Sequence, residues 1–267
     1  MAEHLAARSA VGGRPVTGPI DLEAVLMLCE RDVARYLRER AQLYGSLART
    51  VVWLFVLGAG LRGSVVVPGN VSYLAYVFPG MLVMAVTFAS FQSAIGVIFD
   101  REFGFLKEIL VAPVPRSSIV IGKALAGATI ATLQGVVIFA FAPFAGVRPG
   151  PAAFLAAAGV MLLAAFGLTS VGLAVAARMT SFEGFGTINN FVILPLYFAS
   201  GAQFPLDRAP MWLQTASRFN PLTYAVDLLR GLLVGSWEVG AGLDVAVLAG
   251  FAVAAAAAAA WAFRQTD

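Results

Sequence analysis

The strongest constraint in this sequence is a set of long stretches without any Asp, Glu, Lys or Arg, at residues 73–99, 124–147, 151–177 and 245–263. A helix of roughly 20 apolar residues is enough to cross a bilayer core about 30 Å thick. The composition agrees, because 60% of the 267 residues are hydrophobic and only 12% are charged, against roughly 25% in a soluble domain. The sequence therefore predicts an all-α membrane protein.

Two further spans are predicted from weaker patterns. Residues 184–203 are uncharged but contain Asn189 and Asn190, and such groups are tolerated at membrane depth only against protein or a water-filled cavity. Residues 43–61 reach spanning length only if Arg49 extends its charged end toward the headgroups. Six transmembrane helices are therefore expected.

The distribution of positive charge predicts how the spans are oriented. With six spans, all but five of the 18 Lys and Arg residues lie at the ends predicted to be cytoplasmic, as the positive-inside rule requires. Both termini are then cytoplasmic. The five residues on the other side are Arg62, Arg148, Arg208, Arg218 and Arg230.

The segment before the first span divides into two parts. Residues 1–20 contain Gly, Pro and Arg but no continuous apolar stretch of the kind a secretory signal needs, and we expect a flexible cytoplasmic tail. Residues 21–42 are predicted to form an amphipathic helix lying in the membrane interface, with a soluble helix that packs on a partner as the alternative. The predicted apolar face consists of Leu22, Leu26, Cys29, Val33 and Leu37.

The stretch between the second and third spans, "DREFGFLKEILVAPVPRSSIVIGK" at residues 100–123, mixes charged and apolar side chains at helical spacing until Pro113 and Pro115 end the pattern. A connection that only reverses the chain needs about four to six residues. This longer segment is therefore predicted to be held by a partner protein.

A second distinctive stretch, residues 198–233, reads "FASGAQFPL" and then "APMWLQTASRFNPLTYAVDLLRGLL". Asn220 is a suitable N-cap and Pro221 a suitable first-turn residue, so two short helices are predicted within residues 204–233, each too short to cross a bilayer. Asp227 and Arg230, three positions apart, are predicted to pair. An ordinary solvated loop is the alternative.

These two motifs, in this order, resemble the permease subunits of the ABC-2 type family of ATP-binding cassette exporters, and the resemblance extends over residues 21–264. It implies that residues 43–267 form an ABC-2 type transmembrane domain. It also implies a cytoplasmic coupling helix after the second span, which docks in a groove of an ATPase subunit. Two short re-entrant helices in the outer leaflet, between the fifth and sixth spans, complete the expected fold.

The resemblance also implies function, partners and site residues. The expected complex has two ATPase subunits and a second permease copy, in the bacterial cytoplasmic membrane, and exports an amphiphile such as a drug, lipid, polyketide or lipid-linked glycan. Phe103 and Phe105 are the expected apolar anchors of the ATPase contact. The full ATPase-contact set is Glu102, Phe103, Phe105, Leu106 and Glu108, and the re-entrant exit region comprises Asn220, Pro221, Tyr224, Asp227 and Arg230.

Several other functions are excluded by missing residues. No G-x-x-x-x-G-K-[ST] phosphate-binding loop occurs, so ATP and Mg²⁺ are expected on the separate ATPase and no cofactor in this chain. A single His and a single Cys leave no metal site and no catalytic triad. The basic residues lie at the ends of apolar runs, which does not indicate nucleic-acid binding.

Polar residues within the spans predict the pathway. Gln92, Asn189 and Asn190 are expected to line it, because buried amides seek partners or water; helix-to-helix hydrogen bonding is the alternative. A secondary transporter or a structural membrane subunit not driven by ATP is the alternative function. A secondary transporter would show inverted repeats or ionisable groups near the bilayer midplane, and the spans show mainly hydroxyl and amide groups there.

Overall fold

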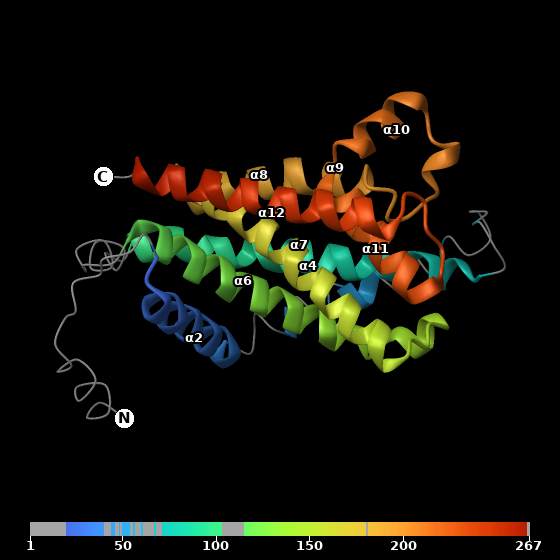
Figure 1. Cartoon of the computed structure of the whole chain (residues 1–267), viewed down its shortest axis with the longest axis horizontal. Helices are drawn as coiled ribbons and strands as arrows, with labels where there is room; N and C mark the ends of the chain where they lie inside the picture. Colours follow the sequence, from blue (N-terminus) through green and yellow to red (C-terminus); the bar gives the residue numbers. More distant parts are fainter. Residues whose placement is uncertain are drawn as a thin grey trace.

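The computed structural model of the chain describes residues 20–39, 71–102, 115–179 and 181–265, with isolated positions between 44 and 67. Every regular element in these ranges is a helix, and the long helices lie side by side (Figure 1). We call the end of the bundle at which the last helix finishes, near Arg264, the proximal end. The opposite end, near Tyr73 and Ala241, is the distal end.

Four of the described helices are long and apolar enough to cross a membrane. They are α4 (Tyr73–Glu102), α6 (Arg116–Phe139), α7 (Pro151–Ala176) and α12 (Ala241–Arg264). This confirms an all-helical chain with several membrane-length helices. The predicted first span at 43–61 and the predicted tail at 1–20 lie largely outside the described residues.

Small residues bring the central helices together. A Cβ atom on Gly127 of α6 would lie 2.5 Å from Thr169 Cγ2 of α7 and 2.9 Å from Ser93 Oγ of α4, so the three helices meet at this glycine. In the alanine-rich α12, Ala252, Ala255 and Ala259 are buried. Close helix contact, rather than exposure to lipid alone, therefore accounts for this face of α12.

The third span begins earlier than predicted. The charge-free run suggested 124–147, whereas α6 begins at Arg116, directly after Pro115, and ends at Phe139. Lys123 therefore lies within the helix, where its charge is tolerated because it is paired with Asp100. Beyond Phe139 the short 3-10 helix η1 (Ala142–Ala145) turns the chain.

The predicted span at 184–203 is a composite helix. It consists of α8 (Phe182–Ile188), the π-helical segment η2 (Asn189–Ile193) and α9 (Leu194–Phe198). Pro195 lacks the amide that would continue a regular α-helical ladder, and π turns commonly accommodate such interruptions. The helix ends at Phe198, before the predicted limit at residue 203, and the rest of the stretch is a turn.

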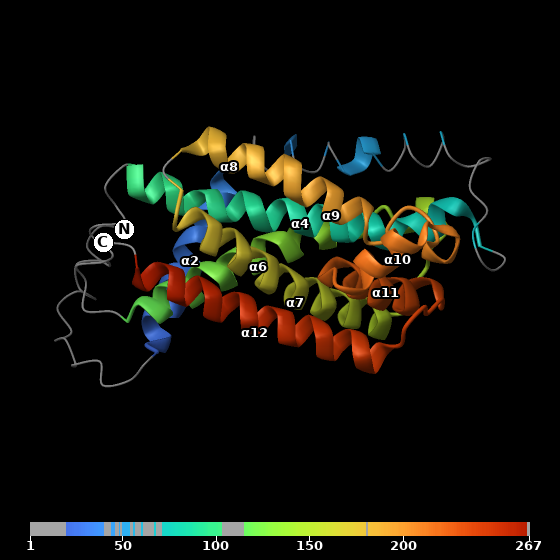
Figure 2. The same cartoon turned by 90° about the horizontal axis from the view of Figure 1, so that it is seen from above.

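The N-terminal helix α2 (Leu22–Arg38) packs along α6 and runs obliquely to the long axis of the bundle (Figures 1 and 2). Asp21 caps its first turn. The predicted apolar face points largely away from the protein, because Leu22, Leu26 and Leu37 are all more than half exposed. The interfacial location stays a prediction, and this outward apolar edge is what contact with lipid requires.

The two short helices predicted near the distal end are α10 (Met211–Arg218) and α11 (Pro221–Val234). The short 3-10 helix η3 (Leu206–Arg208) precedes them. The first, α10, projects from the bundle (Figure 1). The second, α11, is buried against α4, α7 and α12. A fully solvated loop is therefore wrong for α11, and its insertion in the outer leaflet stays a prediction.

Candidate functional site

A buried ion pair joins α4 to α6 at the proximal end. Lys123 Nζ donates a hydrogen bond to Asp100 Oδ2 at 2.5 Å, and the two side chains are only 4% and 6% exposed. Asp100 lies in the last turn of α4, where the helix dipole disfavours negative charge. The pairing with Lys123, rather than the helix itself, therefore stabilises this carboxylate.

Helix α2 contributes to the same ion pair. Asp32 Oδ2 lies 3.6 Å from Lys123 Nζ, and Arg31 and Arg35 approach the Asp100 carboxylate to 3.6 and 3.9 Å. The two arginines also pair with Asp32 and Glu39 of their own helix. We call these residues the proximal charge cluster: Arg31, Asp32, Arg35, Glu39, Asp100 and Lys123.

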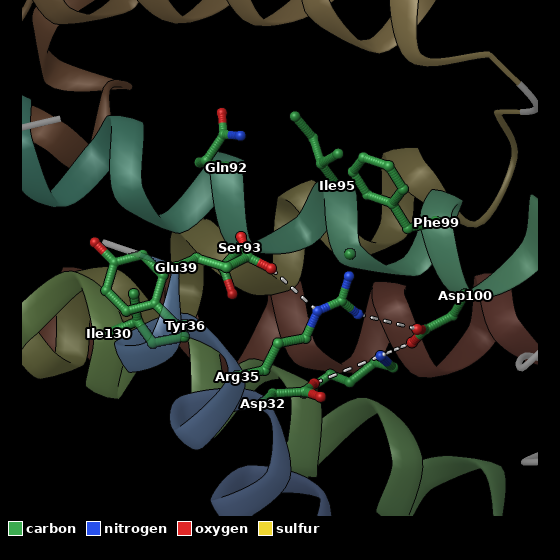
Figure 3. A pocket seen from close by; sticks show the side chains of 12 residues that line it. Asp32, Arg35, Tyr36, Glu39, Gln92, Ser93, Ile95, Phe99, Asp100 and Ile130 are labelled. Atoms are coloured by element: carbon green, nitrogen blue, oxygen red, sulfur yellow. Dashed lines mark hydrogen bonds and ion pairs between the residues drawn. The ribbon is translucent and has the colours of Figure 1, made fainter. Parts of the chain in front are cut away.

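A cavity of about 100 Å³ lies beside this cluster, between α2, α4 and α6 (Figure 3). Its lining combines the charged side chains with Tyr36, Ser93 and Phe99. Tyr36 is buried and its hydroxyl accepts a hydrogen bond from Gln134 of α6. The cluster has three cations and three anions, but Arg31 does not line the cavity, so its lining carries two cations and three anions.

The three residues predicted to line a pathway are not brought together by any contact within the chain. Gln92 is exposed and, with Ile95 and Phe99 of α4, lines the same cavity that Arg35 borders (Figure 3). Asn190 is also exposed, whereas Asn189 is half-buried with its Oδ1 atom lacking a hydrogen-bond partner. The pathway lining stays a prediction.

Only one residue of the predicted ATPase contact lies within the described residues. Glu102 is the last residue of α4, and Phe103, Phe105, Leu106 and Glu108 lie outside the described residues. The helices that precede and follow this segment in the sequence, α4 and α6, are joined by the ion pair of Asp100 with Lys123.

The distal end holds a second buried charge network, centred on Arg230 of α11, which is only 1% exposed. Its guanidinium donates to Glu238 Oε1 at 3.0 Å and to the Gly201 carbonyl at 2.8 Å, and it lies 3.9 Å from the centre of the Tyr76 ring. Arg230 thus joins α11 to α4, to the turn after α9 and to the loop before α12.

Asp227 does not pair with Arg230 as predicted. Its carboxylate instead accepts hydrogen bonds from the backbone amides of Glu238, Val239 and Gly240, at 2.8, 2.9 and 3.4 Å. The loop before α12 supplies both sets of partners, amides for Asp227 and the Glu238 carboxylate for Arg230. The charges three positions apart are therefore satisfied separately, by one loop that the spacing did not reveal.

Two further details hold this loop in place. Gly231 has no side chain, and a Cβ atom there would lie 2.2 Å from the Trp237 ring, so the ring covers the backbone of α11. Burial raises the pKa of the Glu238 carboxyl group above its usual range, although the adjacent Arg230 guanidinium opposes this shift. The residues of this distal network are Tyr76, Asp227, Arg230, Trp237 and Glu238.

The start of α11 was predicted correctly. Asn220 is its N-cap, with Oδ1 accepting from the Leu222 amide at 3.0 Å, and Pro221 follows in the first turn. The Asn220 side chain also donates to the Leu196 carbonyl of α9 at 2.6 Å. The Tyr224 hydroxyl donates to the Arg218 carbonyl, also at 2.6 Å. These residues connect α9, α10 and α11 into one unit.

The sequence analysis did not identify several residues that form the ion pairs and hydrogen bonds of the two networks. Asp32, Asp100 and Lys123 were counted only as charges at span ends, and Tyr76 and Glu238 were not singled out. A signal existed at the proximal end, since a charge of each sign bordered the two apolar runs that flank residues 103–114. At the distal end no spacing rule links α4 to a loop more than 150 positions later.

Membrane-length helices that enclose buried charge networks at both ends define a multi-pass helical membrane protein. The chain belongs to the ABC-2 type transporter family, which it matches over residues 23–234. That range contains the proximal charge cluster and the distal network except for Trp237 and Glu238, which lie in the loop before α12. The resemblance inferred from the two motifs is confirmed.

Relatives within this family carry transport and nodulation names. The chain is 33% identical to the putative transport permease ycf38 of Cyanophora paradoxa over 223 residues, which is 81% of this chain and 76% of that protein. It is 36% identical to nodulation protein J of Rhizobium leguminosarum bv. trifolii over 198 residues, 73% of this chain and 75% of the relative. For nodulation protein J of Rhizobium meliloti the identity is 33%, over 80% and 82% of the two chains.

Proposed function

We propose that this chain is the permease subunit of an ATP-driven exporter, in which two copies form the pathway and two separate ATPase subunits supply the energy. The observation that carries the proposal is membership of the ABC-2 type transporter family. The structure supports it through the helices that precede and follow residues 103–114, because the end of α4 and the start of α6 both lie at the proximal end (Figure 1). In this proposal the proximal end is cytoplasmic and the distal end faces outward.

The pathway in this proposal runs along the face of α4 that carries Gln92 and borders the cavity beside α2. Gln92 and Asn190 are exposed amides on helices whose other exposed side chains are mostly apolar, such as Phe191. Amides in contact with lipid would be costly. A second permease copy or a water-filled cavity between two copies would satisfy them.

The proposed substrate is an amphiphile, such as a drug, a lipid, a polyketide or a lipid-linked glycan. The exposed side chains of the four membrane-length helices are largely apolar, for example Leu155, Leu162, Val253 and Trp261. A pathway bordered by such side chains favours molecules with an extended apolar part. Export is the direction that the family resemblance implies.

The test is affinity purification of the chain with its ATPase, followed by native mass spectrometry and measurement of ATP hydrolysis. A complex of two permeases with two ATPases is expected. The double variant Phe103→Ala/Phe105→Ala should weaken ATPase binding at least tenfold, since aromatic anchors carry much of an interface's binding energy. Phe144→Ala, an exposed distal change, is the matched control.

Inverted membrane vesicles provide the test of direction. ATP-dependent accumulation of a fluorescent amphiphile such as rhodamine 6G, abolished by vanadate, is expected. Accumulation driven by an ion gradient without ATP would favour a secondary transporter and contradict the proposal. A purified particle with a single permease chain would contradict the proposed pathway between two copies.

A further inference from the structure

We infer that the proximal ends of α7 and α12 form a binding site for the phosphate group of an anionic phospholipid. Arg178 and Arg264 are its phosphate-binding side chains, and Trp261 lies between them in the sequence of contacts described below. We call these three residues the proximal arginine site. The inference goes beyond the proposed export function, because it requires only that the long helices cross a membrane. Neither the proximal charge cluster nor an ATPase takes part in it.

Arg178 follows the end of α7 and is held in place by α12. Its guanidinium carbon lies 5.0 Å from the centre of the Trp261 ring, a distance at which a cation is attracted to the face of an indole. Its Nη2 atom also donates a hydrogen bond to Gln265 Oε1 at 3.2 Å. Stacking uses the flat face of the guanidinium, and Gln265 uses one of its five N–H groups. Because the side chain is exposed, the remaining edge can donate to phosphate oxygens.

Arg264 adds a second guanidinium group on the same face of α12. Trp261 and Arg264 are three positions apart on this helix, a spacing that places two side chains next to each other. Both are exposed, as is Arg178. Neither arginine forms an ion pair with an acidic side chain in the part of the chain that the structure describes. The site therefore presents two positive charges to an anion.

The end of α12 does not oppose an anion at this place. The last carbonyl groups of a helix carry a partial negative charge, which by itself would repel phosphate. Arg116 Nη1, from the start of α6, donates hydrogen bonds to the carbonyl oxygens of Phe263 and Arg264, both at 3.0 Å. Its charge offsets that of the helix end, so the charge around the proximal arginine site is positive.

A lipid fits this surface better than a soluble anion or a protein does. Trp is enriched where a membrane meets water, and Trp261 is 55% exposed on the least buried of the four membrane-length helices, which runs along one side of the bundle (Figure 2). From Trp261, exposed side chains continue along the same face through Ala257 to Val253. This apolar track runs toward the distal end, as the acyl chains of a lipid would if its phosphate lay at the arginines.

The experiment titrates the purified chain in a neutral detergent with dioleoyl phosphatidylglycerol or dioleoyl phosphatidylcholine, and native mass spectrometry counts the bound lipid. Both lipids have the same acyl chains and a phosphate diester, but only phosphatidylglycerol has a net charge. We expect about thirtyfold higher affinity for phosphatidylglycerol, the size that two basic residues next to anionic headgroups provide. Inorganic phosphate should not displace the bound lipid, because it lacks acyl chains.

Two variants and a matched control assign this preference to the site. Arg178→Met/Arg264→Met should reduce it to about threefold or less, because both positive charges are removed. The control Arg148→Met/Arg218→Met removes two exposed distal arginines, and its preference should stay within about twofold of the unsubstituted chain, because only charges close to the headgroup act on it. Arg264→Gln alone should lose about fivefold. It removes no described contact of the side chain, so it tests the site even if the double variant fails to fold.

Four results would each overturn the proximal arginine site. Equal affinity for the two lipids would show that the unsubstituted chain does not recognise the anion. Equal losses in the double variant and its control would show a general effect of net charge. Displacement by inorganic phosphate would show that a soluble anion is the ligand. An unchanged lipid preference in Arg178→Met/Arg264→Met, with loss of a co-purifying ATPase, would show a protein contact instead. If no ATPase co-purifies with the unsubstituted chain, only the proposed function fails.

Discussion

Replacing Arg230 by Met is expected to destabilise the distal end more than any other single change there. The substitution keeps much of the side-chain volume but removes the charge that neutralises Glu238, the donor to the Gly201 carbonyl and the cation over the Tyr76 ring. Breaking a buried pair by removing one partner costs about 3–5 kcal/mol. Glu238 is 33% exposed, so part of its charge can be solvated and the lower figure of about 3 kcal/mol applies.

The assay is thermal unfolding of the purified chain in one detergent, followed by size-exclusion chromatography of the fraction that stays monodisperse. At about 2–4 °C per kcal/mol for a chain of this size, Arg230→Met should lower the apparent Tm by about 6–12 °C. Arg218→Met on the exposed side of α10 is the matched control, and its Tm should change by no more than about 2 °C.

A double-variant comparison then tests the physical cause. Because Glu238→Gln removes the charge that Arg230→Met leaves unpaired, the double variant should recover part of the lost Tm. If Arg230→Met unfolds within 2 °C of the unsubstituted chain, the distal network is not what holds the loop before α12. Equal losses in the single and double variants would show that packing, rather than charge, explains the effect.

Three further predictions concern the same region. Gly231→Ala should displace the Trp237 ring, seen as a shift in tryptophan fluorescence and a lower Tm, whereas Gly242→Ala, where nothing lies within 4 Å of the added atom, should have no such effect. Burial raises the pKa of Glu238 above its ordinary 4.5, so the folded chain holds this proton more tightly than the unfolded chain. The resulting contribution to stability is fully present below pH 4.5 and is lost as pH rises through the folded pKa, a slope that Glu238→Gln should remove. Asn220→Ala should cost about 1 kcal/mol from the lost cap, measured as Tm, and Asn220→Asp should recover the cap but not the hydrogen bond to the Leu196 carbonyl.

The apolar runs predicted the long helices well where no charge is paired inside them. For α7 the charge-free window matches the helix to within one residue, whereas α12 begins four residues before its window and contains the buried Asp244. For α6 the same rule failed, since Lys123 is accommodated by a partner on another helix. The charge pattern of one segment cannot predict a partner that lies on another helix.

Residue type also predicted the start of α11 correctly, because Asn prefers the N-cap position and Pro prefers the first turn of a helix, whatever the rest of the fold. The spacing of Asp227 and Arg230 misled for the opposite reason. Helical neighbours pair weakly when better partners are available, and a loop eight to thirteen positions later offers three amides and a carboxylate. Tertiary contacts of this kind are outside what periodicity can predict.

The composite helix from α8 to α9 has a consequence for how the chain is made. Its 17 residues, from Phe182 to Phe198, reach only about 25 Å at 1.5 Å per residue, short of a hydrocarbon core of about 30 Å. At the distal end α11 follows, and it is fastened through Asp227 to the amides just before α12. During synthesis, this part of the protein therefore stays incomplete until the ribosome has produced residue 240 and the final helix, so biogenesis of the distal end is a late event that depends on the last segment of the chain.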